Sequence, residues 1–190
     1  MKSAIFVGAL LLLSLCACSV KQEPAGPQSQ NRQDGFQLVD KSGNIRKPSD
    51  FRASYEALGT FTVLNPPSGN EMHVTYASPG TAEIYRKTGK FPDGAVLVKE
   101  VFGTQHAQMT TGDAHWAAGI KVWFVMIKDD KARYSGNPLW GDGWGWALFK
   151  ADAPDKQVAT NYRTDCLGCH IPARNTDWIY VQGYPVLTAK

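Results

Sequence analysis

The stretch AVLVKEVF, from Ala95 to Phe102, carries the pattern that decides the fold class. It is rich in β-branched and aromatic residues, which favour strands. Side chains alternate between the two faces of a strand, so Leu97 and Lys99 share one face. Val98 and Glu100 share the other. An inward-facing lysine needs a reason, and the plainer alternative is that Lys99 reaches solvent or pairs with a carboxylate.

Three more runs of the same character lie on either side of this stretch. They are HVTY (73–76), KVWFVMIK (121–128) and WGWALFKA (144–151). Turn sequences such as FPDG (91–94) and GNP (136–138) separate them. The sequence therefore predicts a mainly β fold, an antiparallel sheet with a few short peripheral helices. The tryptophans of NPLWGDGWGWALF (137–149) are expected to pack in a core or a dimer interface.

Three short helices are predicted around this sheet. The first begins near Ser49 and Asp50, a good N-cap pair, and ends before Gly59. The second runs from about Thr81 to Lys87 and stops at Gly89. The third begins at about Lys156 and leads into the cysteine motif near the C-terminus.

The N-terminus predicts export. Met1-Lys2 precedes an apolar run, Ala4 to Leu13, which is too short to span a bilayer and is typical of a secretory signal. The following LCAC, Leu15 to Cys18, has the pattern of a bacterial lipoprotein signal. Cleavage after residue 17 would leave Cys18 as a lipid-modified N-terminus on the periplasmic side of a membrane. An ordinary signal peptide with incidental cysteines is the alternative.

The rest of the chain divides into two parts. Residues 18–35 are polar and rich in Pro, Gln and Ser, as in a flexible tether. Residues 36–190 are enough for one domain with a core of its own. The net charge of the 190-residue chain, +3, is too small to indicate a nucleic-acid partner.

The motif near the C-terminus is TDCLGCHIPA, residues 164–173, which holds Cys166, Cys169 and His170. C-x-x-C-H is the attachment motif of haem c, in which both thiols bond to the haem and the histidine becomes an axial ligand of the iron. We therefore expect one covalently attached haem c, held by Cys166 and Cys169, with His170 as the metal ligand.

Two other uses of the cysteine pair are disfavoured by the sequence. A structural zinc site needs four ligands, usually from a second close pair of Cys or His, and His73, His106 and His115 show no such pairing. A thioredoxin-like redox pair follows a strand in a βαβ unit, a pattern this chain lacks. A disulfide is the main alternative to haem.

Three segments, taken in order, resemble the cytochrome P-460 family, which includes the β-sheet cytochromes c′. They are FPDGAVLVKE (91–100), YRTDCLGCH (162–170) and NTDWIYVQGYPVL (175–187). The resemblance extends from about Ser49 to Leu187. It implies an antiparallel β fold, a homodimer and one haem c with an open sixth coordination site. Family members either oxidise hydroxylamine or bind nitric oxide and similar small ligands.

The resemblance also implies roles for single residues. Lys99 matches the lysine that bonds to the haem edge in hydroxylamine-oxidising members. Phe124 matches a strand position where those members carry a carboxylate base, and it resembles an apolar cap over the iron. His73 matches a distal-pocket arginine. The plainer alternatives are a core role for Phe124 and a partly exposed strand position for His73. His106 and His115 are expected in a solvated loop.

Three function classes follow. The first is a haem protein with an open distal site that binds nitric oxide or a similar nitrogen ligand, because Phe124 cannot act as a base. The second is an enzyme that oxidises hydroxylamine with a cross-linked Lys99. The third is an electron carrier for a redox partner protein, which would want a sixth ligand. Met72, Met109 and Met126 lie in no ligand motif, so the first class is favoured.

Overall fold

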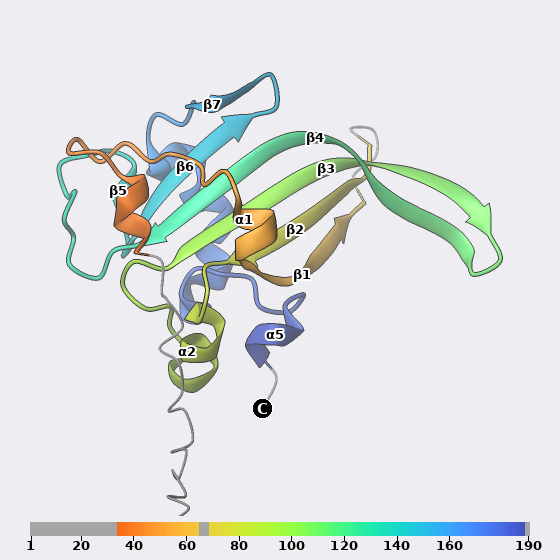
Figure 1. Cartoon of the computed structure of the whole chain (residues 1–190), viewed down its shortest axis with the longest axis horizontal. Helices are drawn as coiled ribbons and strands as arrows, with labels where there is room; N and C mark the ends of the chain where they lie inside the picture. The colour runs from red at the N-terminus through yellow and green to blue at the C-terminus, as the bar shows by residue number, and fades with distance from the viewer. Residues whose placement is uncertain (1–33, 65–68, 189–190) are drawn as a thin grey trace, which may run out of the picture.

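The computed structural model describes residues 34–64 and 69–188 of the chain. The predicted signal peptide, Cys18 and almost all of the predicted tether lie outside these residues. The described part contains a seven-stranded antiparallel sheet with short helices around it (Figure 1). This confirms the predicted mainly β class.

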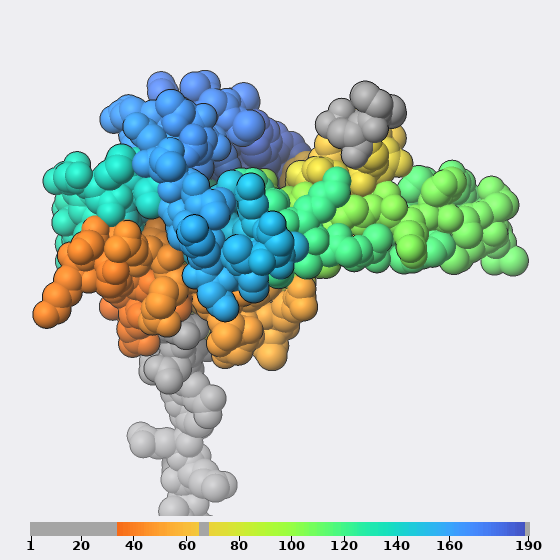
Figure 2. Space-filling model, turned by 90° about the horizontal axis from the view of Figure 1, so that it is seen from above, coloured from red at the N-terminus to blue at the C-terminus, as the bar shows by residue number. Residues whose placement is uncertain are grey.

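The sheet has the strand order β1-β2-β3-β4-β6-β5, with β7 paired to β6. The strands are β1 (Glu56–Val63), β2 (Glu71–Ala77), β3 (Val96–Met109), β4 (Gly112–Lys128), β5 (Trp140–Gly141), β6 (Trp144–Lys150) and β7 (Ala153–Gln157). All four predicted runs lie in strands of this sheet, in β2, β3, β4 and β6. β3 and β4 are central and long, and their far ends project from the body as a two-stranded ribbon (Figures 1 and 2).

The helices are all short. They are η1 (Gly35–Leu38), α1 (Phe51–Ser54), α2 (Thr81–Thr88), α3 (Tyr162–Asp165), α4 (Leu167–His170), η2 (Ile171–Thr176) and α5 (Pro185–Thr188). No helix in the described part of the chain is long and apolar enough to cross a bilayer.

The helix predictions had mixed outcomes. α2 matches its prediction and ends at Gly89, which adopts the left-handed conformation that glycine tolerates at a helix C-terminus. The first prediction was wrong in its end, because Glu56 already begins β1. The third was wrong in its start, because residues 153–157 pair with β6 as β7. The helix that precedes the cysteine motif, α3, begins only at Tyr162.

The sheet is covered on both faces, as Figure 2 shows with the N-terminal segment (orange) and the C-terminal segment (blue) on opposite sides. One core joins Leu97 and Met126 to residues of the C-terminal segment such as Trp178. The other joins Val98 and Val125 to residues of the N-terminal segment. The alternation predicted for β3 is therefore confirmed.

A buried charged residue, Glu100, lies on the face of the sheet that packs against the N-terminal segment. Its side chain is fully buried. Its carboxylate accepts hydrogen bonds from Arg52 Nε at 3.0 Å and from Trp123 Nε1 at 2.9 Å. A buried carboxylate is tolerated when it is paired and hydrogen-bonded, so Glu100 fastens α1 to the sheet.

Candidate functional site

A cavity of about 190 Å³ lies between the C-terminal segment and the face of the sheet that carries Leu97 and Met126. That volume is far larger than the share of one water molecule, roughly 30 Å³. The sheet side is lined by residues that include Leu97, Lys99, Phe124, Met126 and Trp146. The opposite side carries Cys166, Cys169, His170, Tyr180 and Tyr184. The structure therefore brings together five of the predicted site residues: Lys99, Phe124, Cys166, Cys169 and His170.

Two short helices present the cysteine motif to this cavity. α3 begins at Tyr162, and the side chain of the preceding Asn161 caps it by accepting a hydrogen bond from Arg163 N at 3.0 Å. Cys166 lies between α3 and α4, and it is buried. Cys169 is more exposed, and both cysteines of the described chain carry free thiols. The motif thus sets two thiols and an imidazole along one side of the cavity.

The orientation of His170 is fixed by the main chain. Its Nδ1 lies 2.7 Å from the carbonyl oxygen of Trp178, which can only accept, so Nδ1 is the donor. In the neutral ring Nε2 then holds the lone pair that a metal needs. Burial lowers the pKa of His170 and thereby favours the neutral ring. The ring also meets Trp146 edge-on, with 4.9 Å between centroids.

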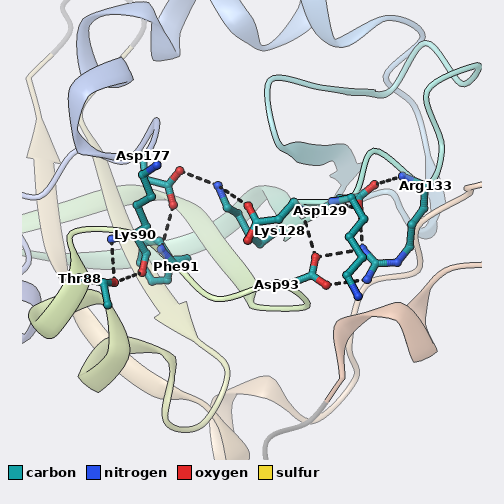
Figure 3. A network of polar contacts seen from close by, with 10 residues as sticks. Thr88, Lys90, Phe91, Asp93, Lys128, Asp129, Arg133 and Asp177 are labelled. Atoms are coloured by element: carbon teal, nitrogen blue, oxygen red, sulfur yellow. Dashed lines mark hydrogen bonds and ion pairs between the residues drawn. The ribbon is translucent and has the colours of Figure 1, made fainter.

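The Trp178 carbonyl is held by a tight turn. Asp177 and Trp178 both have positive φ, 59° and 69°, which is uncommon outside glycine. Figure 3 shows what fixes the turn: Asp177 accepts from the backbone N–H of Phe91 at 2.8 Å and from Lys128 Nζ at 2.7 Å. Both partners of the ion pair are only 6% exposed. The buried ion pair of Lys128 and Asp177, at the end of β4, therefore holds in place the Trp178 carbonyl that accepts the hydrogen bond from His170.

The same figure shows a second ion-pair cluster next to Lys128. Arg133 donates to Asp129 at 2.6 Å and also to Asp93 at 2.9 Å. This cluster ties the FPDG turn to the loop after β4. The end of β4 that carries Lys128 is thus braced from both sides.

Lys99 and Phe124 face each other across β3 and β4 as a direct pair in the register. The Nζ of Lys99 lies 4.4 Å from the centre of the Phe124 ring. Burial lowers the pKa of Lys99, and this effect exceeds the opposing influence of nearby Cys169 and Glu71. Of the two orientations left open for Lys99, the structure has the inward one, in which the side chain lines the cavity.

One carboxylate, Asp165, is among the described residues that line the cavity. Its oxygens already accept hydrogen bonds from Thr160 N at 2.7 Å, from Asn161 N at 3.1 Å and from Thr164 Oγ1 at 2.8 Å. These bonds lower its pKa to about 2. Asp165 therefore serves as a structural acceptor and is a poor proton acceptor at neutral pH.

His73 is not among the described residues that line the cavity. Its Nε2 instead lies 3.1 Å from the Glu71 carboxylate on the same strand. Burial lowers the pKa of His73. The distal-pocket role that the resemblance implies for His73 stays a prediction.

The sequence reasoning missed several residues of the site. Trp146 was assigned to packing, yet it both packs in the core and contacts His170. Trp178, Asp177 and Lys128 were not singled out, although Asp177 and Trp178 lie in the NTDW segment that supported the resemblance. Tyr180 was also missed, and its hydroxyl donates to the Cys169 carbonyl at 2.7 Å.

The donor set of the cavity fits a haem. The cavity offers two thiols, one imidazole whose Nδ1 is engaged so that Nε2 can bind a metal, and a largely apolar sheet side, which is the set of groups that a covalently attached haem requires. A family model described as Cytochrome P460 matches residues 48–181, which is more than half of the chain. No curated protein matches the sequence.

Proposed function

Because the chain belongs to the cytochrome P460 family, whose members bind haem, we propose that it is a mono-haem c-type cytochrome that binds nitric oxide. Cys166 and Cys169 would hold the haem, and His170 would coordinate its iron. Addition of each thiol across one vinyl group would need no oxidant, because the carbon–sulfur bond forms while the thiol proton goes to the neighbouring vinyl carbon. Bound haem supplies an iron that takes a small ligand.

The protonation of Cys166 supports attachment over a redox disulfide. Burial raises the pKa of its thiol to about 11, with the Asp165 charge adding to the effect. Redox C-x-x-C pairs work through a thiol whose pKa is lowered. A buried and protonated Cys166 therefore lacks the activated thiol that is typical of a redox C-x-x-C pair.

The ligand preference rests on one observation: the described lining of the cavity offers no free carboxylate base. Phe124 cannot accept a proton, and the oxygens of Asp165 are engaged. Oxidation of hydroxylamine releases protons, and a positioned base typically contributes about 10²–10⁴-fold in rate. The apolar Phe124 favours nitric oxide, which needs no hydrogen bond, over ligands that do.

Lys99 supports a second candidate, hydroxylamine oxidation with a lysine–haem cross-link. It lines the same cavity as Cys166 and His170, and its lowered pKa increases the share of neutral, nucleophilic amine. Joining Nζ to a ring carbon with loss of one hydrogen from each withdraws two electrons, so this step requires an oxidant. Because nitric oxide binding has no such requirement, hydroxylamine oxidation with a cross-linked Lys99 is the less favoured of the two functions.

The test uses the haem-loaded full chain. We expect the reduced protein to bind nitric oxide and to show negligible turnover of hydroxylamine with an electron acceptor. Phe124→Glu should add a base and raise that turnover at least about tenfold. Phe124→Leu, the matched control, should keep nitric oxide binding and gain no turnover.

Two results would contradict the proposal. Rapid hydroxylamine turnover by the wild type, together with a Lys99 adduct in the mass spectrum of the haem peptide, would establish the second candidate. Haem that dissociates from the wild type on a denaturing gel would rule out covalent attachment through the two cysteines.

A further inference from the structure

The far ends of β3 and β4 form a ribbon outside the body, which we call the hairpin arm and define as residues 104–117. Strand pairing in the arm is confined to β3 and β4, from Thr104 with Ala117 to Met109 with Gly112. Figures 1 and 2 show the arm projecting past the neighbouring strands. The loop expected here was wrong, because the residues continue the two central strands, but the expected exposure to solvent holds for His106.

This correction brings two histidines and an aspartate together. His106 and His115 are direct cross-strand partners in the register, so they share one face of the ribbon. Asp113 lies two residues before His115 and therefore points to the same face. The histidine rings stack, with 5.0 Å between centroids and 12° between planes.

Both histidines turn a ring nitrogen toward the same carboxylate. His106 Nδ1 lies 3.0 Å from Asp113 Oδ1, and His115 Nε2 lies 3.4 Å from Asp113 Oδ2. One donor atom from each of the three residues lies within 4.8 Å of the others. This arrangement is a convergent set of two nitrogen donors and one oxygen donor.

We propose that His106, Asp113 and His115 form a binding site for a divalent transition-metal ion of the zinc type. Zinc takes imidazole and carboxylate ligands with bonds of about 2.0–2.2 Å. A tetrahedral ion then holds its donor atoms about 3.4 Å apart. The contacts of the two histidines with the Asp113 carboxylate, 3.0 Å to Oδ1 and 3.4 Å to Oδ2, are already close to that spacing.

The exposure of the cluster fits such a site. The His106 and Asp113 side chains are more than half exposed, and the His115 side chain is 26% exposed. Small torsional changes can therefore bring the three donors together without disturbing a core. Three protein ligands leave a coordination position for water or for a group from another molecule.

The metal type follows from the donors. Imidazole suits zinc and copper, whereas magnesium and calcium prefer sites made of oxygen ligands. Copper(II) shares this donor preference and ranks above zinc in the general order of affinities. The site is independent of the haem proposal, because it uses none of the cavity residues.

The test is isothermal titration of Zn²⁺ into the full, haem-loaded chain after removal of metals by a chelator. We expect one zinc per chain at the arm. His106→Ala and His115→Ala should each weaken binding by at least about tenfold, since loss of an outer-shell partner alone costs 10–100-fold. Asp113→Asn should weaken it as well. Mg²⁺ should not bind.

Gln105→Ala is the matched control. Gln105 lies in the same strand but pairs with Trp116, on the opposite face of the ribbon from His106. Its removal should leave zinc binding unchanged. The proposal is overturned if the wild type binds no zinc, or if zinc binding survives in both histidine variants. A His106→Ala protein with an unchanged haem spectrum shows that the body is intact, so any loss of zinc belongs to the arm.

Discussion

The two halves of the β3–β4 hairpin differ in what surrounds them. The inner half, Val96–Val101 with Val122–Lys128, pairs with β2 on one side and β6 on the other and is covered on both faces. The arm pairs only with itself. Irregular pairing between Val101 and Thr104 marks the boundary, as β-bulges often do. The same two strands thus build both the cavity and an exposed ribbon.

This difference shows that surroundings, more than strand membership, set the importance of a polar side chain. Inner polar groups such as Glu100 and Lys128 are buried and paired. Arm groups such as Asp113 are exposed to water. Replacing a buried polar side chain of the inner half should therefore lower the stability of the whole fold. Replacing an exposed polar side chain toward the arm should have only a local effect.

The largest contrast is expected between two lysines of β4. Lys128→Met leaves Asp177 buried without its partner, and breaking a buried pair typically costs about 3–5 kcal/mol. Lys121→Met removes a pair with Glu71 in which the lysine is 40% exposed, and such pairs are worth about 0–1 kcal/mol. Chemical denaturation of both variants measures the difference. Equal losses would contradict the expectation that a buried ion pair matters more than an exposed one.

The Lys128 variant also tests the support of His170. If the ion pair holds the turn at Trp178, Lys128→Met should change the Fe–His stretching frequency of the reduced haem protein. Lys121→Met should leave that frequency unchanged. A shift in neither variant would show that the turn keeps its geometry without the ion pair.

A smaller contrast is expected between two glycines. A Cβ at Gly145 would lie 2.6 Å from the Trp140 ring, and overpacking of this kind costs about 1–3 kcal/mol. A Cβ at Gly119, near the base of the arm, would meet nothing within 4 Å. Gly119→Ala should therefore change the unfolding free energy by less than about 0.5 kcal/mol. Thermal melts of Gly145→Ala and Gly119→Ala measure the difference. A larger drop in melting temperature for Gly119→Ala than for Gly145→Ala would contradict this prediction.

The smallest contrast concerns pH. Backbone hydrogen bonds lower the pKa of Asp165 to about 2 in the folded chain, below its ordinary value of about 3.9. Its contribution to stability is therefore present above pH 4 and lost as the pH falls through 2. Asp165→Asn should lower the melting temperature at pH 6, and the difference should shrink toward pH 2. A difference that does not depend on pH would contradict this reading.

Asp113→Asn on the arm is the control for that measurement. The Asp113 side chain is exposed and contacts His106 and His115 rather than the body. Local opening of the arm does not require the body to unfold. Its melting temperature should therefore follow the wild type across the same pH range.

The inner half could be predicted from sequence because cover on both faces leaves apolar residues at nearly every position, as in KVWFVMIK. The arm could not, because GTQHAQMTTGDAH is polar and resembles a loop. Its pairing depends on continuation from the strands behind it. Residues 153–157 were likewise missed as a strand because they pair only briefly, with the edge of β6.

The candidate site also has a part that the sequence predicts and a part that it does not. Cys166, Cys169 and His170 form a local motif, so their spacing alone indicated the chemistry. The neighbours of His170 come from distant segments: Trp146 from β6, and the Trp178 carbonyl from a turn that Lys128 of β4 supports. Such contacts depend on the packing of the sheet against the C-terminal segment. Spacing within the sequence contains no information on them.

The partner of His170 is a main-chain carbonyl, and this choice makes the contact robust. A carboxylate in that place would gain and lose a proton with pH, and a mutation could delete it. A peptide carbonyl does not titrate in this range, and any amino acid at position 178 retains it. The electron density that His170 offers to a metal is thereby insulated from both acidity and side-chain variation. It remains adjustable through the backbone torsions of Asp177 and Trp178, which set the direction of the carbonyl.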